Sequence, residues 1–173
     1  TPIETISLSK LTNLDGTIVI ATKSYANKAI AQELKDKAAT GPVVIMQNGV
    51  GVEKPFLDAH LSPIYRCVLY VTSQATSEYD FSLRPITSSP IGIVNGNESG
   101  LKKCVEDLTT DGLPFRSEVN IQREIWKKAI INSVFIPSIL FLIVSISTLF
   151  INSIFTPSLV ASTLALNSET SKS

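Results

Sequence analysis

Short apolar runs alternate with longer amphipathic segments in the first third of the chain. The runs at 17–21 and 42–47 are rich in β-branched residues and too short for core helices, so they predict strands buried on both faces of a parallel sheet. Segment 24–39 has apolar side chains at helical spacing, and segment 52–61 predicts a short helix with Pro55 in its first turn. This alternation of strand and helix predicts parallel βαβ units. The apolar positions of the first helix are Ala26, Ala29, Ile30 and Leu34.

From residue 66 onward the pattern changes to strands without helices between them. Three runs predict an antiparallel or mixed edge of the same sheet, at 66–73, 83–86 and 91–94. Segment 97–110 then predicts a helix, and 114–116 a last short strand. Asn120 can cap a final helix that begins at Ile121. The inward positions of the helix over 97–110 are Leu101, Cys104, Val105 and Leu108. The predicted fold class is therefore α/β.

Composition shows that the end of the chain differs from the rest. The 173 residues are 44% hydrophobic and 17% charged, and the charged share is below the roughly 25% of an ordinary soluble domain. The deficit is local, because no charged residue occurs between Lys128 and Glu169. Fifteen basic and fifteen acidic residues give a net charge of zero, so we expect no nucleic-acid partner.

The apolar tail over 138–173 has three interpretations. Residues 139–151 are nearly all apolar, and the uncharged stretch exceeds the roughly 20 residues that a membrane span needs. Asn152, Pro157, frequent serines and the lack of basic residues after the run count against a span within 138–166. The segment could equally be translated non-coding sequence after a broken reading frame, or the start of a divergent buried helix. The sequence leaves all three open.

Two isolated cysteines, Cys67 and Cys104, have neither a CxxC spacing nor a histidine near them in the sequence. They predict reduced, partly buried thiols and no metal site. The chain starts at Thr1 without a basic N-terminal region or an early apolar core, which predicts no signal peptide. We therefore expect a cytoplasmic protein, with anchoring to a membrane through the C-terminal apolar segment as the alternative.

Two polar residues directly follow the predicted parallel strands. Lys23 comes after the first strand, and Asn48 follows the second in an Asn-Gly-Val-Gly sequence. Ligands of open parallel sheets bind at the carboxyl ends of the strands. A cation and a carboxamide there could hold phosphate or ribose hydroxyls together with an organic substrate. Each also has a simpler explanation, as a solvated lysine and as ordinary turn chemistry.

The predicted final helix carries four residues on one face, because Glu124, Lys128, Asn132 and Ile136 are spaced four apart. One interpretation is a helical salt bridge from Glu124 to Lys128 with Asn132 solvated, and spacing alone favours it. In the other, Lys128 faces a cleft and donates a hydrogen bond and then a proton to an oxygen that gains negative charge. Asn132 would then orient the substrate.

Three motifs together resemble the ketopantoate reductase (2-dehydropantoate 2-reductase) family. They are Thr-Lys-Ser-Tyr at 22–25, Asn-Gly-Val-Gly at 48–51 and Glu-Ile-Trp-Lys-Lys-Ala-Ile-Ile-Asn at 124–132. The resemblance covers roughly 15–135. It implies reduction of the ketone of 2-dehydropantoate by NADPH, on the route to pantothenate and coenzyme A. It also implies a Rossmann domain joined to an all-helical domain, with the active site in the cleft between them.

The resemblance also implies roles for five residues. Lys128 resembles the family's catalytic lysine, and Asn132 a substrate-binding asparagine one turn further along the helix. Asn48 resembles the asparagine that touches both cofactor and substrate. Lys23 and, less securely aligned, Ala75 resemble contacts to the nicotinamide cofactor. These roles are consistent with the chemistry, because hydride arrival at a carbonyl carbon leaves an oxyanion that needs a nearby proton donor.

The sequence departs from the family pattern in ways that predict a fragment with an incomplete cofactor site. No G-x-G-x-x-G turn occurs, and Ile136 replaces a further substrate-binding asparagine. We expect a partial Rossmann-like dinucleotide-binding domain over 1–117, the first helix of a C-terminal helical domain over 118–137, and the divergent tail over 138–173. The alternative to an impaired reductase is a non-catalytic degenerate paralogue or a tail-anchored binding module.

Overall fold

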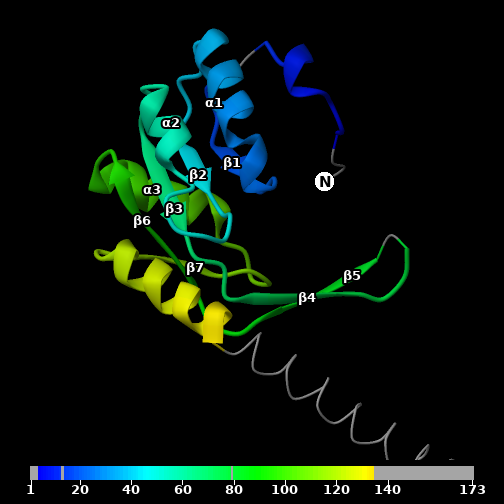
Figure 1. Ribbon diagram of the computed structural model, residues 1–173. Helices are drawn as coiled ribbons and strands as arrows, with labels where there is room; N and C mark the ends of the chain where they lie inside the picture. Colours follow the sequence, from blue (N-terminus) through cyan, green and yellow to red (C-terminus); the bar gives the residue numbers. More distant parts are fainter. Residues whose placement is uncertain (1–3, 13, 79, 135–173) are drawn as a thin grey trace, which may run out of the picture. The chain divides into compact units, whose positions relative to one another are not determined.

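A computed structural model describes residues 4–12, 14–78 and 80–134 of the chain. Contacts divide the protein into two compact units, Thr1–Ala129 and Ile130–Ser173. All of the labelled strands and helices belong to the first unit (Figure 1). The second is described only over 130–134, the last residues of a helix that spans 121–134. Ile136 and the predicted span within 138–166 lie outside the described residues.

A five-stranded mixed sheet forms the centre of the first unit, with strand order β1-β2-β3-β6-β7 (Figure 1). The first three strands run parallel to one another, β6 runs antiparallel to β3, and β7 runs parallel to β6. This arrangement confirms the predicted α/β fold with a parallel sheet. The strands are β1 (Ile18–Ile20), β2 (Val43–Ile45), β3 (Ile64–Cys67), β6 (Ser89–Asn95) and β7 (Phe115–Ser117).

Helices cover both faces of this sheet. Alternate side chains of β2 and β3 point to opposite faces, so each strand contributes to two apolar clusters. On one face, α1 (Asn27–Asp36) and α2 (Lys54–Asp58) pack apolar residues against Ile45 and Ile64. On the other face, α3 (Glu98–Leu108) buries Leu101 and Cys104 against Val44 and Tyr65. The predicted helix over 97–110 is thereby confirmed.

Two predictions about the first βα unit need correction. The short turn η2 (Ser24–Ala26) precedes α1, so the helix begins three residues later than predicted and buries Asn27, Ala31 and Leu34, while Ala29 is exposed. Val19 of β1 is 41% exposed, because β1 is an edge strand and not one buried on both faces. Periodicity alone does not distinguish an edge strand from a central one.

The predicted strand over 66–73 is wrong, since the chain leaves the main sheet within it. β3 ends at Cys67, and β4 (Val71–Ala75) pairs only with β5 (Phe81–Pro85) in a separate two-stranded antiparallel sheet. The antiparallel member of the main sheet is β6, which lies between β3 and β7 and not at an edge. One apolar sequence run therefore spans two different sheets.

The helix of residues 121–134 begins as predicted. The Asn120 side chain accepts a hydrogen bond from the Arg123 backbone N–H at 3.1 Å, which is the expected N-cap interaction. Ile121 and Ile125 are buried and cluster with Val68, which follows β3. The start of this helix is thus fixed to the sheet. Among the described residues, no helix is long and apolar enough to span a bilayer.

Gly92 of β6 permits this close packing. A Cβ atom at this position would lie 2.5 Å from Ile121 Cβ and 2.7 Å from the Glu118 carbonyl oxygen. Gly92→Ala is therefore expected to lower the free energy of unfolding by about 1–3 kcal/mol, as overpacking does in a dense interior. Urea denaturation measures this loss.

Gly112→Ala is the matched control for this prediction. A Cβ on Gly112 would meet no atom within 4 Å, so its effect is expected to stay within about 0.5 kcal/mol. Equal unfolding midpoints for Gly92→Ala and the wild-type protein would contradict the close approach of the helix to β6.

Candidate functional site

The register of the parallel strands brings three loops to the carboxyl edge of the sheet, where β1, β2 and β3 end. Ile20 of β1 is aligned with Ile45 of β2, and Ile45 with Arg66 of β3. Three positions beyond these aligned residues lie Lys23, Asn48 and Leu69, respectively. All three loops follow the carboxyl ends of parallel strands, where ligands of this fold class bind.

Lys23 and Asn48 present free polar groups at this edge. Both side chains are exposed, and neither forms a hydrogen bond or an ion pair with another residue in the described part of the chain. Gly49 has φ +110° and Gly51 has φ +75°, a backbone conformation that glycine adopts readily. An ammonium group and a carboxamide beside this turn suit phosphate, ribose and carboxamide groups, so they fit part of a nicotinamide dinucleotide.

A buried amide pair holds the two loops in place. Asn27 Nδ2 donates to Gln47 Oε1, and Gln47 Nε2 donates to Asn27 Oδ1, both at 2.7 Å. Gln47 Nε2 also donates to the Thr22 carbonyl oxygen at 2.7 Å, and Asn27 Nδ2 donates to the Val52 carbonyl oxygen at 2.8 Å. The loop after β1, the start of α1 and the loop after β2 are therefore connected by one hydrogen-bond network.

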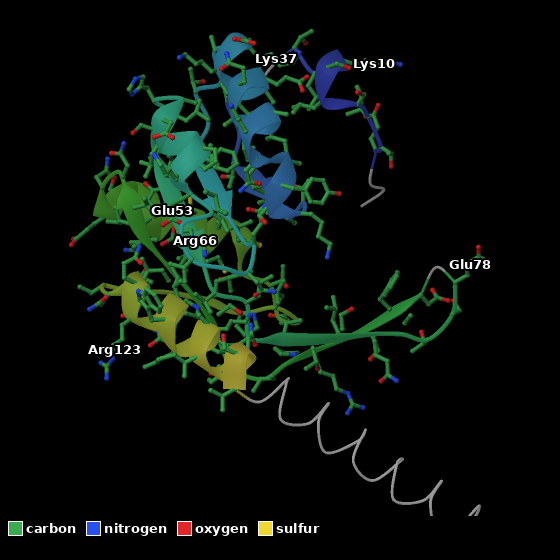
Figure 2. All side chains as sticks on the ribbon, viewed as in Figure 1. Lys10, Lys37, Glu53, Arg66, Glu78 and Arg123 are labelled. Atoms are coloured by element: carbon green, nitrogen blue, oxygen red, sulfur yellow. The ribbon has the colours of Figure 1, made fainter. Side chains whose placement is uncertain are left out.

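Arg66 adds a buried cation beneath the loop that carries Asn48. Its guanidinium donates to the carbonyl oxygens of Gln47 at 3.3 Å and Gly49 at 2.9 Å, on either side of Asn48. The Nε atom lies 3.5 Å from Glu53 Oε2, and the two residues are labelled next to each other in Figure 2. The residue is 1% exposed, and burial lowers its pKa, which Glu53 opposes.

Lys128 extends from the helix of residues 121–134 toward the end of β3. Its ammonium donates a hydrogen bond to the Leu69 carbonyl oxygen and lies 5.7 Å from the centre of the Tyr70 ring. The side chain is half-buried, and this desolvation lowers its pKa. Cys67 opposes the shift, but burial raises the pKa of that thiol to about 12, so it carries no charge at neutral pH.

The predicted helical salt bridge from Glu124 to Lys128 is not formed. The Glu124 carboxylate accepts from Lys127 Nζ at 2.6 Å and from the Tyr70 hydroxyl at 3.2 Å. The hydrogen bond from Lys127 lowers the pKa of Glu124, and burial raises the pKa of Tyr70. Lys128 consequently has no carboxylate partner within the described residues.

The remaining predicted site residues lie on other elements. Asn132 is half-buried, one turn beyond Lys128 on the same helix, and belongs to the second unit. Ala75 is the last residue of β4, exposed and opposite Phe81. Register and contacts thus associate Lys23, Asn48 and Lys128 with one sheet edge, while Ala75 lies on the separate hairpin.

The two cysteines are free; the sequence predicts partly buried thiols, and the structure buries both completely. Over 4–12, 14–78 and 80–134, no group of three or more histidine, cysteine and acidic side chains is arranged to hold a metal ion.

Several residues at this edge were not predicted from the sequence. Asn27, Gln47 and Arg66 form the supporting network, and Tyr70 lies against Lys128. The sequence contained one signal of this network, an arginine in the otherwise apolar run of β3. A buried arginine requires hydrogen-bond or ion-pair partners.

The family model described as "Ketopantoate reductase PanE/ApbA" matches residues 2–95, more than half of the chain. This match includes Lys23, Asn48 and Ala75, whereas Lys128 and Asn132 lie beyond it. No curated protein sequence matches significantly.

Two solved structures illustrate the fold similarity. A D-mandelate dehydrogenase in complex with NADH has a TM-score of 0.58 and 22% identity, covering 68% of this chain and 40% of its own. A PanE/ApbA family ketopantoate reductase from Ralstonia eutropha has a TM-score of 0.54 and 19% identity, covering 70% and 40%. The present chain thus spans about 40% of the length of these structures. From the family match, this chain belongs to the ketopantoate reductase PanE/ApbA family.

Proposed function

We propose that this chain carries part of the active site of an NADPH-dependent reductase whose substrate is a 2-oxo acid, namely 2-dehydropantoate. The product would be pantoate, on the route to pantothenate and coenzyme A. The observation that carries the proposal is Lys128, a half-buried lysine without a carboxylate partner among the described residues. Its ammonium lies at the sheet edge to which the loops of Lys23 and Asn48 belong.

Lys128 would act as the proton donor. When bound, NADPH supplies the hydride that reduces the carbonyl carbon. As charge develops on the carbonyl oxygen, the Lys128 ammonium donates a hydrogen bond to it and then the proton that forms the alcohol. Desolvation makes this ammonium more acidic than that of a solvated lysine, which eases the transfer. In this step Lys128 must exchange its bond to the Leu69 carbonyl for one to the substrate.

The other predicted residues would bind and orient. Lys23 is proposed to hold a phosphate or ribose group of the cofactor, and Ala75 to contact the cofactor through its backbone. Asn48 would bridge cofactor and substrate, since its free carboxamide both donates and accepts hydrogen bonds. Asn132 would orient the substrate. The buried network below Lys23 and Asn48 supports this assignment, because binding groups act best on preorganised loops.

The proposal is tested by NADPH binding and turnover. Fluorescence titration is expected to show weak or no NADPH binding by the 173-residue chain alone, because it contains no G-x-G-x-x-G turn. The complete gene product is expected to bind NADPH and oxidise it when 2-dehydropantoate is added. Micromolar binding by the chain alone would show that the turn is not required.

Absence of turnover with every 2-oxo acid tested would contradict the reductase and favour a non-catalytic paralogue. Carbonate extraction of cell membranes then separates the tail-anchored alternative, since only a membrane-spanning chain resists release.

A further inference from the structure

Glu124 has an unexpected partner for its place on the helix. A glutamate four residues before a lysine is the favoured geometry for a helical ion pair, and Lys128 occupies that position. The carboxylate is instead paired with Lys127, three residues along the chain, at 2.6 Å. Glu124 is only 9% exposed, whereas the Lys127 side chain that pairs with it is about half exposed.

We propose that Lys127 is a positioning residue that, together with the Tyr70 hydroxyl, occupies the Glu124 carboxylate and so keeps Lys128 free of an ion pair. Lys127 Nζ binds Oε1 and the Tyr70 hydroxyl binds Oε2, so both oxygen atoms are engaged. In the part of the chain that the structure describes, Lys128 contacts a backbone carbonyl and an aromatic ring, neither of which carries a formal charge. A catalytic role for this arrangement rests on the proposed function, whereas the contacts are independent of it.

The charged and titratable groups around this cluster come from several elements. Cys67 of β3 acts on Lys128 through space, and Tyr70 contacts Lys128 with its ring and Glu124 with its hydroxyl. Arg116 of β7 also acts on the Glu124 carboxylate through space, but its guanidinium is paired with Glu118 at 2.5 Å. When Lys127 is removed, Lys128 is the cation of the same helix at the favoured four-residue spacing from Glu124.

The prediction is that Lys127→Met raises the pKa of Lys128 by about one pH unit, because a carboxylate then stabilises its charged form. Lys128 is observed directly by NMR after reductive dimethylation of its amine with ¹³C-formaldehyde and a borane reductant, and its resonance is assigned by its loss in Lys128→Met. This readout needs neither cofactor nor turnover, so its failure is distinct from failure of the proposed function.

A double-mutant cycle excludes simple charge repulsion as the cause. Deleting any nearby cation raises the pKa of a lysine, so Lys127→Met is also made in the Glu124→Gln background. If Lys127 acts through Glu124, its removal raises the Lys128 pKa more in the wild-type background than in the Glu124→Gln background. Equal rises in both backgrounds, or no rise in either, would overturn the proposal.

The conservative variant Lys127→Arg supplies a rescue. Its guanidinium can still pair with Glu124, so the Lys128 titration is expected to stay at its wild-type position. A rise as large as that in Lys127→Met would also overturn the proposal. Circular dichroism of each variant confirms that the comparison is made between folded proteins.

Discussion

Lys128→Met is expected to lower kcat for 2-oxo acid reduction by about 10²–10⁴-fold in the complete gene product, the usual loss when a proton donor is removed. Methionine keeps most of the apolar stem but cannot donate to the developing oxyanion. Ground-state binding should change less, so KM is expected to vary little compared with kcat. Steady-state assays of NADPH oxidation measure both quantities.

Stability distinguishes a chemical role of Lys128 from a structural one. Over the described ranges, the partners of its half-buried ammonium are a carbonyl and a ring, so its removal is not expected to destabilise the fold. Lys103→Met is the matched control, because Lys103 is an exposed lysine of α3 whose ion pair with Asp107, four residues along the helix, is long at 4.0 Å. Unchanged kcat in Lys128→Met would contradict the catalytic assignment, as would a kcat loss explained by unfolding.

Lys128 is expected to make the free energy of unfolding depend on pH in a definite direction. Burial lowers the pKa of Lys128 in the folded state, so the unfolded chain binds more protons between the folded and unfolded pKa values. The contribution of Lys128 to stability therefore rises as pH increases through that interval. The difference in unfolding free energy between wild type and Lys128→Met is expected to shift in favour of wild type at alkaline pH, as urea denaturation can measure.

Local sequence signals predicted the elements that carry the site. The apolar run that contains β2 requires burial on both sides, and its position between two amphipathic segments requires parallel pairing. Asn120 offers a side-chain oxygen at the start of an apolar helical pattern, so the N-cap was also predictable. Both signals depend on residues close together in the chain, and Lys23 and Asn48 were located in the same way.

The supporting contacts could not be predicted, because they join residues far apart in sequence. The pairing of Gln47 with Asn27 spans 20 positions, and the bond from Lys128 to Leu69 spans 59. The choice of Glu124 between Lys127 and Lys128 depends on Tyr70, which lies 54 positions away. The four-residue spacing alone predicts Lys128 as the partner of Glu124. That prediction is wrong, because helical spacing contains no information about Tyr70.

Arg66→Met is expected to lower the free energy of unfolding by about 3–5 kcal/mol, the range found when one partner of a buried ion pair is removed. The variant leaves the Glu53 carboxylate without its cation and removes the donors for the carbonyl oxygens of Gln47 and Gly49. The loop that carries Asn48 should loosen at the same time. Urea denaturation gives the stability, and a weaker response to NADPH in the complete gene product would report the loop.

Two further variants identify the cause of this loss. Arg123→Met removes a cation from an exposed side chain of the helix of residues 121–134 (Figure 2), and its effect is expected to stay within about 0.5 kcal/mol. Adding Glu53→Gln to Arg66→Met should recover part of the stability, because no unpaired charge then remains buried. If Arg66→Met were as stable as Arg123→Met, Arg66 would not be what holds the Asn48 loop. Full recovery in the double variant would instead show that the ion pair alone, and not the two carbonyl contacts, accounts for its effect on stability.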